Sequence, residues 1–100
     1  KAFTVNDFPI VERDFAFLVD KNLAVGDLIK SITNIDKNLI KEVSIFDIFD
    51  GKNIEEGKKS VGLRVKMQHG EKTMSSEEID LISNKLIDSV AKTFSATLRK

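Results

Sequence analysis

The sequence contains no cysteine, which excludes a disulfide framework, an iron–sulfur cluster and a thiolate nucleophile. Its apolar runs reach only about five or six residues, whereas a transmembrane helix needs roughly 20, and no signal-peptide pattern opens the chain. The sixteen basic and sixteen acidic residues cancel, so bulk charge does not favour a polyanionic partner. These absences predict a cytoplasmic protein that makes no contact with a membrane.

One hundred residues with 41% hydrophobic content are enough for one domain, which would bury roughly two-thirds of the surface of its unfolded chain. We therefore expect residues 1–100 to form a single domain, with residues 1–9 as an N-terminal arm that ends at the only proline. Because the chain begins at Lys1 without a methionine, we expect it to be a piece excised from a longer protein.

The spacing of apolar residues changes along the chain between the period of a strand and that of a helix. The clearest alternation lies at Ser60–Met67, where every odd position is apolar. Ser75 and Glu78 form a capping-box pattern that starts a helix. The predicted strands are Arg13–Val19, Leu39–Asp50, Ser60–Met67 and Ser95–Arg99, and the predicted helices are Ala24–Ile35 and Ser75–Phe94.

The resulting order, β-α-β-β-α-β, predicts a ferredoxin-like α+β sandwich. Each predicted helix carries a single apolar stripe, so both helices should pack on one face of a four-stranded antiparallel sheet. The other face of the sheet, called the open face below, should remain uncovered. Function should be sought on that open face.

Alternation along the strands assigns side chains to the two faces. If Phe15, Phe17 and Val19 face the helices, Ala16 faces outward between Asp14 and Leu18. In the second strand, Phe46 and Ile48 suit the core, Asp47 and Phe49 share the open face, and Ile45 fits either side. The remaining outward residues are Ser60, Gly62, Arg64, Lys66, Thr97 and Arg99.

This combination of side chains can bind single-stranded RNA. A base can stack on Phe49 while Asp47 and Ser60 hydrogen-bond its edge, and the small residues Ala16 and Gly62 admit it close to the sheet. The cations that could meet phosphates are Arg64, Lys66 and Arg99. Read alone, however, these cations are more typical of the solvated face of any one-sided sheet, and phosphate contact is the alternative.

Five ordered blocks of the sequence resemble the ferredoxin-fold anticodon-binding domain that closes the phenylalanyl-tRNA synthetase beta chain. The blocks are Phe8–Asp14 with Ala16, Gly26–Leu28, Phe46–Gly51, Glu56–Ser60, and Lys72–Met74 with Glu77 and Glu78. The resemblance implies RNA contacts at Ala16, Asp47, Phe49 and Ser60. Some relatives have tyrosine where this chain has Phe49, which keeps the aromatic face but lacks the hydroxyl donor.

The resemblance also implies partners beyond the chain itself: tRNA, the remaining beta domains and the alpha subunit of a heterotetrameric enzyme. ATP, magnesium and phenylalanine would then bind in the other subunit type, so we expect this domain to hold no catalytic residue, cofactor or metal. The lone histidine, His69, is interpreted as a turn residue beside Gly70.

Two other classes of function remain open at this stage. Sheets of this shape also serve as protein-interaction or small-ligand regulatory modules, and the balanced charge suits such a role. The fold is shared by small hydrolases similar to the acylphosphatases, which bind phosphate with an arginine and a glycine-rich loop after the first strand. Residues 20–23 contain neither an arginine nor a glycine, which argues against the hydrolase.

Overall fold

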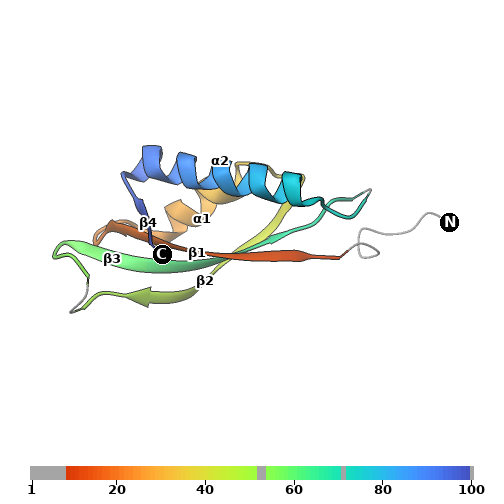
Figure 1. Ribbon diagram of the computed structural model, residues 1–100. Coiled ribbons are helices and arrows are strands. Elements are labelled where there is room, and N and C mark those ends of the chain that lie inside the picture. The colour runs from red at the N-terminus through yellow and green to blue at the C-terminus, as the bar shows by residue number, and fades with distance from the viewer. Residues whose placement is uncertain (1–8, 52–53, 71, 100) are drawn as a thin grey trace.

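The chain folds into one sheet with two helices lying across the same face, as the computed structural model in Figure 1 shows. The structure describes residues 9–51, 54–70 and 72–99, so the predicted arm at residues 1–9 lies outside it except for the exposed Pro9. The elements are β1 (Val11–Asp20), α1 (Val25–Thr33), β2 (Ile40–Phe49), β3 (Lys58–Met67), α2 (Ser76–Phe94) and β4 (Thr97–Arg99).

The strands lie in the order β2-β3-β1-β4, and each neighbouring pair is antiparallel. This arrangement confirms the predicted ferredoxin-like fold with both helices on one face. Within the described residues, neither helix combines the length and the hydrophobicity that crossing a membrane would require.

Several element boundaries differ from the sequence prediction by one or two residues, including the start of β3 and the end of α1, and two of the differences have a clear physical reason. Strand β1 begins at Val11 rather than Arg13, because it pairs with the whole of β3 and Val11 lies opposite Met67. Strand β4 begins at Thr97 rather than Ser95, because Ser95 adopts a left-handed conformation with φ of 54° and caps the end of α2. Tertiary pairing and a backbone cap, rather than side-chain periodicity, set these two ends.

The start of α2 is confirmed as a capping box. The backbone N–H of Glu78 donates to Ser75 Oγ at 3.2 Å, and the backbone N–H of Ser75 donates to Glu78 Oε1 at 2.9 Å. This hydrogen bond from Ser75, together with the nearby charge of Lys72, lowers the pKa of the Glu78 carboxyl. The ionised form of Glu78 therefore stabilises the folded chain.

We expect the Glu78→Gln variant to lose less stability than the wild type when the pH is lowered. A carboxyl whose pKa is lower in the folded chain contributes stability above its unfolded pKa, and that contribution disappears as the pH falls through the folded pKa. The free energy of unfolding in urea should therefore fall more for the wild type than for the variant as the pH is lowered from about 6 to about 3. Glu77→Gln, in the same helical turn, is the control; equal pH profiles for wild type and Glu78→Gln would contradict this role.

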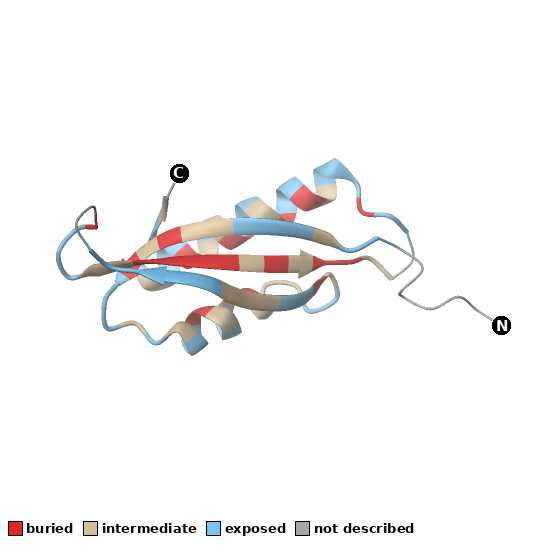
Figure 2. Cartoon of the chain, turned by 90° about the horizontal axis from the view of Figure 1, so that it is seen from below, coloured by how far each residue is buried: buried red, intermediate tan, exposed pale blue. Residues whose placement is uncertain are grey.

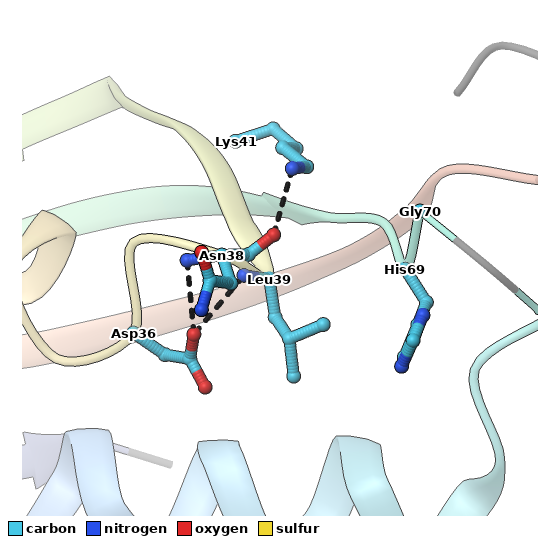
Figure 3. Close-up of a pocket in the computed structure, with 6 residues that line it drawn as sticks. All are labelled: Asp36, Asn38, Leu39, Lys41, His69 and Gly70. Atoms are coloured by element: carbon cyan, nitrogen blue, oxygen red, sulfur yellow. Dashed lines mark hydrogen bonds between the residues drawn. The ribbon is translucent and has the colours of Figure 1, made fainter. Parts of the chain in front are cut away.

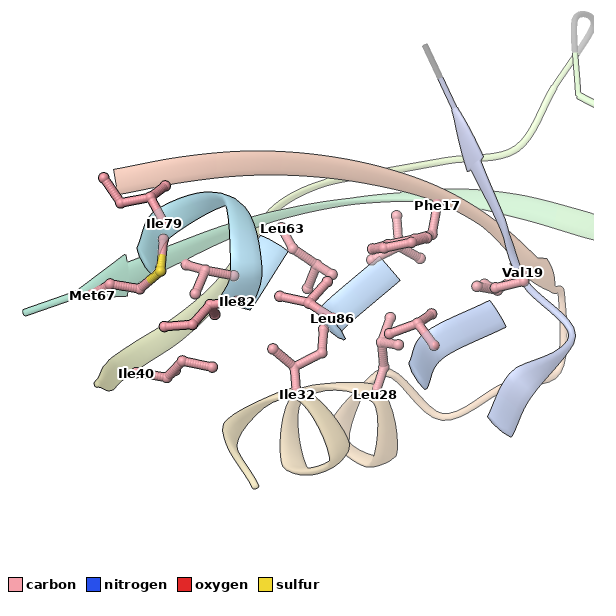
Figure 4. Packing of buried hydrophobic residues seen from close by; sticks show 14 of the residues in the cluster. Phe17, Val19, Leu28, Ile32, Ile40, Leu63, Met67, Ile79, Ile82 and Leu86 are labelled. Carbon is pink, nitrogen blue, oxygen red and sulfur yellow. The ribbon is translucent and has the colours of Figure 1, made fainter. Parts of the chain in front are cut away.

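The core lies between the two helices and the sheet face that they cover (Figure 4). Apolar side chains from β1 and β3 meet the stripes of α1 and α2, so the alternation predicted for these strands is confirmed. The fully buried side chains are Phe17, Val19, Leu28, Ile32, Val61, Leu63, Val65, Met67, Leu86 and Val90. The same alternation then fixes which residues of β3 face away from the helices.

Figure 2 views the sheet from below, on the side away from the helices, and shows β3 as the most buried strand with β1 and β2 more exposed around it. Three large apolar side chains near the end of β2 are exposed to solvent: Phe46, Ile48 and Phe49. This end of β2 therefore presents apolar surface to solvent.

Candidate functional site

Strand pairing shows which residues share the open face, because residues opposite each other in an antiparallel pair point to the same side. Four of the predicted site residues fall into two adjacent rows across β1, β3 and β2. The first row contains Leu18, Ser60 and Phe49, and the second contains Ala16, Gly62 and Asp47. The pairing therefore brings Ala16, Asp47, Phe49 and Ser60 together on one face, as the sequence predicts.

The two residues of the first row that were predicted to contact RNA differ in accessibility. Phe49 is 44% exposed, and its ring passes over Gly51, with ring Cζ 3.2 Å from where a Cβ on that glycine would be. Ser60 is only 3% exposed, because Leu18 and Phe49 flank it on the neighbouring strands. A ligand can lie directly on Phe49, but it reaches Ser60 only if a neighbouring side chain moves.

Phe46 lies on the open face, so its predicted place in the core is wrong. Ile45 pairs with Leu63 and Asp47 pairs with Gly62, which leaves Phe46 as the extra residue of a β-bulge. Ile45, which fitted either side by sequence, consequently packs against the core. The bulge turns the ring of Phe46 outward, where it is 51% exposed.

The ring of Phe46 fills the space above Gly62. A Cβ on this glycine would lie 2.8 Å from Phe46 Cζ, which is closer than real Cβ contacts. The prediction that Gly62 admits a base close to the sheet is therefore wrong, because the ring already covers it and Gly62 is buried. The glycine itself was the missed signal, since a glycine inside a strand often marks a bulge or a close approach.

Ile48 was also assigned to the core, and this assignment is wrong for a different reason. It pairs with Val61 and so points to the helix side of the sheet, but it is 52% exposed. In Figure 1 the end of β2 lies away from both helices, so nothing among the described residues covers Ile48 as the helices cover Val61.

The cations Arg64 and Lys66 lie on the open face beyond these rows, and both are paired with carboxylates. Arg64 Nε donates to Asp14 Oδ1 at 2.9 Å, and a second guanidinium nitrogen donates to Asp14 Oδ2 at 3.2 Å. Lys66 Nζ lies 3.9 Å from Glu12 and 3.7 Å from Glu42. Nothing is described for the side chain of Arg99, the third predicted cation.

These ion pairs determine the charge at this end of the open face. The hydrogen bond from Arg64 lowers the pKa of Asp14, and the same hydrogen bond raises the pKa of Arg64. The carboxylates of Glu12, Asp14 and Glu42 outnumber the two cations that they contact. In the free chain this end is therefore not a positive patch.

A cavity of about 520 Å³ lies at the opposite end of the sheet from Phe49, next to the start of β2 (Figure 3). Its polar groups are used by the loop itself: Asp36 Oδ1 accepts from the backbone N–H groups of Asn38 and Leu39, and Lys41 Nζ donates to the Asn38 carbonyl. His69, on the far side, lies 3.9 Å from Glu78. The described residues contain no cluster of three potential metal ligands here or elsewhere.

The sequence profile of the "Ferredoxin-fold anticodon binding domain" matches residues 6–99. The chain belongs to this family. Relatives named "Phenylalanine--tRNA ligase beta subunit" share 41% identity over 92 residues in Bradyrhizobium diazoefficiens, 41% over 98 in Rhodopseudomonas palustris and 40% over 96 in Bdellovibrio bacteriovorus. These alignments cover 92%, 98% and 96% of the chain but only 12% of each relative. The match to the family therefore includes every residue that the structure describes.

Proposed function

We propose that the chain binds the anticodon region of phenylalanine tRNA through its open face, as one domain of a cytoplasmic phenylalanine–tRNA ligase beta subunit. Its partners would be the other beta domains and the alpha subunit of a heterotetramer. ATP and magnesium would serve the parent enzyme elsewhere, and this domain would supply binding and no catalytic residue. The observation that carries the proposal is the exposure of Asp47 and Phe49 in adjacent rows of the open face.

Each proposed contact follows from the chemistry of its side chain. The half-exposed ring of Phe49 can stack with a base, and the Asp47 carboxylate can accept hydrogen bonds from the amino or imino groups of its edge. Ala16 lies in the row of Asp47, and its small side chain leaves room on β1 for a base to approach the sheet. Ser60 would join these contacts only after the residues beside it move.

Arg64 and Lys66 would contribute less to RNA binding than isolated cations. To contact a phosphate, each must share or leave the carboxylates that now hold it. We therefore assign the bases to the end of the face with Phe49 and any phosphate contact to the end with Arg64.

An NMR titration of the isotope-labelled chain with an anticodon stem-loop of phenylalanine tRNA tests the proposal. We expect selective shifts of the amides of Ala16, Asp47 and Phe49, and weaker shifts with a stem-loop whose loop sequence is scrambled. Equal shifts with both RNAs, or shifts confined to the helix side of the sheet, would contradict binding through the open face.

We expect the double substitution Glu12→Gln and Glu42→Gln to strengthen RNA binding that does not depend on sequence. The change releases Lys66 from both carboxylates and removes one neighbour of Arg64. A plot of log K against log salt should steepen by about 0.7 for each phosphate newly contacted. The pair Glu77→Gln and Asp80→Asn on α2 makes the same change in net charge away from the open face, and an equal effect from it would show that only bulk charge matters.

A further inference from the structure

We infer that Phe46 is a second base-stacking residue of the RNA site, and that Arg64 is a positioning residue that holds its ring in place. This inference rests on the proposed function, since it adds a residue to the same open face. It also gives Arg64 a role other than phosphate contact.

The bulge presents Phe46 and Asp47 on the same side of the sheet, one directly after the other. Asp47 pairs with Gly62, and the ring of Phe46 reaches across to the same glycine. Consecutive residues of a regular strand point to opposite faces, so only the bulge allows this pair. The open face consequently carries two half-exposed rings, Phe46 and Phe49, on either side of the Asp47 carboxylate.

The ring of Phe46 is held by contacts on two sides. Gly62 offers no side chain beneath it, so the ring lies close to the backbone of β3. The guanidinium carbon of Arg64 lies 5.4 Å from the ring centroid, within cation–π range. A ring that is already ordered loses little conformational freedom when a base stacks on it, which favours affinity.

Arg64 is itself fixed by Asp14. Two hydrogen bonds, at 2.9 and 3.2 Å, join its guanidinium to both oxygens of that carboxylate. This bidentate pair sets the plane of the guanidinium, because the donor fork and the carboxylate match each other in geometry. The chain of contacts from Asp14 through Arg64 to Phe46 thus connects β1, β3 and β2 across the open face.

The spacing of the two rings suits two successive bases. Phe46 covers Gly62 and Phe49 lies opposite Ser60, and these β3 positions are two residues apart, or about 6.6 to 6.8 Å along a strand. That distance is roughly twice the 3.4 Å rise between stacked nucleotides, so two successive bases would be unstacked from each other, as the splayed bases of single-stranded RNA are. Each ring could therefore receive its own base, as paired aromatics do on other RNA-binding sheets.

The experiment must distinguish base stacking by Phe46 from a purely structural role of its ring. An aromatic ring above a glycine in a sheet can stabilise the sheet with no ligand at all. Phe46→Leu keeps an apolar side chain over Gly62 and removes the aromatic face, whereas Phe46→Tyr keeps the face. Ile48→Ala is the matched control, because Ile48 lies on the same strand with similar exposure but points to the other side of the sheet.

The test measures the affinity of each variant for the anticodon stem-loop, together with its free energy of unfolding in urea. We expect Phe46→Leu to weaken binding by about five- to a hundredfold, as loss of one stacked base would, while Phe46→Tyr and Ile48→Ala bind within about twofold of the wild type. Gly62→Ala, which retains Phe46 but pushes its ring away, should also weaken binding. It decides the question if Phe46→Leu fails to fold.

Arg64→Met tests the positioning role through the ring-proton resonances of Phe46 in the free chain, which the loss of a phosphate contact would not change. We expect it to broaden or shift the ring-proton resonances of Phe46 in the free chain and to weaken binding equally at low and high salt. A loss of affinity at low salt alone would show that Arg64 contacts phosphate, and would overturn its role as a positioning residue.

The outcomes distinguish this inference from the proposed function. Wild-type affinity in both Phe46→Leu and Gly62→Ala, with binding lost in Phe49→Leu, would overturn the role of Phe46 and leave the RNA site in place. No binding of the stem-loop to the wild-type chain would overturn both. Self-association that Phe46→Leu abolishes, with RNA affinity unchanged, would assign the ring to a protein contact and overturn the inference.

Discussion

Leu63→Ala should lower the free energy of unfolding by about 2–5 kcal/mol, the range observed for removing a buried leucine side chain. Leu63 is completely buried near the middle of β3, with Phe15 and Ile45 opposite it on the neighbouring strands. The two flanking strands and the helices above Leu63 restrict how far the surrounding side chains can move into the cavity that the substitution leaves (Figure 4). Since small domains are stable by only about 5–15 kcal/mol, the variant should be partly unfolded in low concentrations of urea.

Leu81→Ala is the control for this loss. Leu81 is 64% exposed on α2, so the same chemical change creates no cavity there. Urea unfolding followed by circular dichroism should show a large decrease in the midpoint for Leu63→Ala and a decrease below about 0.5 kcal/mol for Leu81→Ala. Similar losses in both variants would mean that the interface between sheet and helices is not the main source of stability.

Phe49→Ala should weaken binding of the anticodon stem-loop by about 1–3 kcal/mol, or roughly five- to a hundredfold, through loss of a base stack. The ring is 44% exposed and lies over Gly51 at the end of β2, so its removal leaves the core intact. The variant should therefore keep most of its stability while losing affinity, which urea unfolding and titration of the same sample would show.

Ile48→Ala separates stacking from a general effect of apolar surface at this strand end. Ile48 adjoins Phe49 and is 52% exposed, but it points toward the helix side of the sheet. Wild-type affinity in Ile48→Ala together with weak binding in Phe49→Ala would support a stack on the open face. A comparable loss in both variants would instead indicate a broad hydrophobic contact that includes both sides of β2.

Periodicity and capping chemistry predict most of the fold from the sequence. The strict alternation of Ser60–Met67 identifies the buried side of β3, and the pattern of Ser75 and Glu78 locates the start of α2. Both signals are local, since they depend on neighbouring residues alone. The same reasoning places Ala16 and Phe49 correctly on the open face because the alternation of β1 and the register at the end of β2 are regular there.

The sequence could not show features that depend on pairing between strands. The bulge at Phe46 reverses the alternation in the middle of β2, and only the register against β3 reveals it. The ion pairs of Arg64 with Asp14 and of Lys66 with Glu42 join residues from different strands. The burial of Ser60 likewise follows from its neighbours across the sheet. Accessibility and charge at the site are therefore tertiary properties.

The position of β2 at the edge of the sheet has a consequence for the behaviour of the chain at high concentration. An edge strand with exposed Phe46, Ile48 and Phe49 offers a template on which a second copy could pair, a common start of aggregation. The ladder of β2 is irregular at two places, between Ile40 and Glu42 and between Ile45 and Asp47, and such irregularities bend an edge out of register with a flat partner. We therefore expect the distortion that orients Phe46 also to hinder pairing between edge strands of two copies, and we expect a redesign that straightened β2 to aggregate more readily while it keeps its fold.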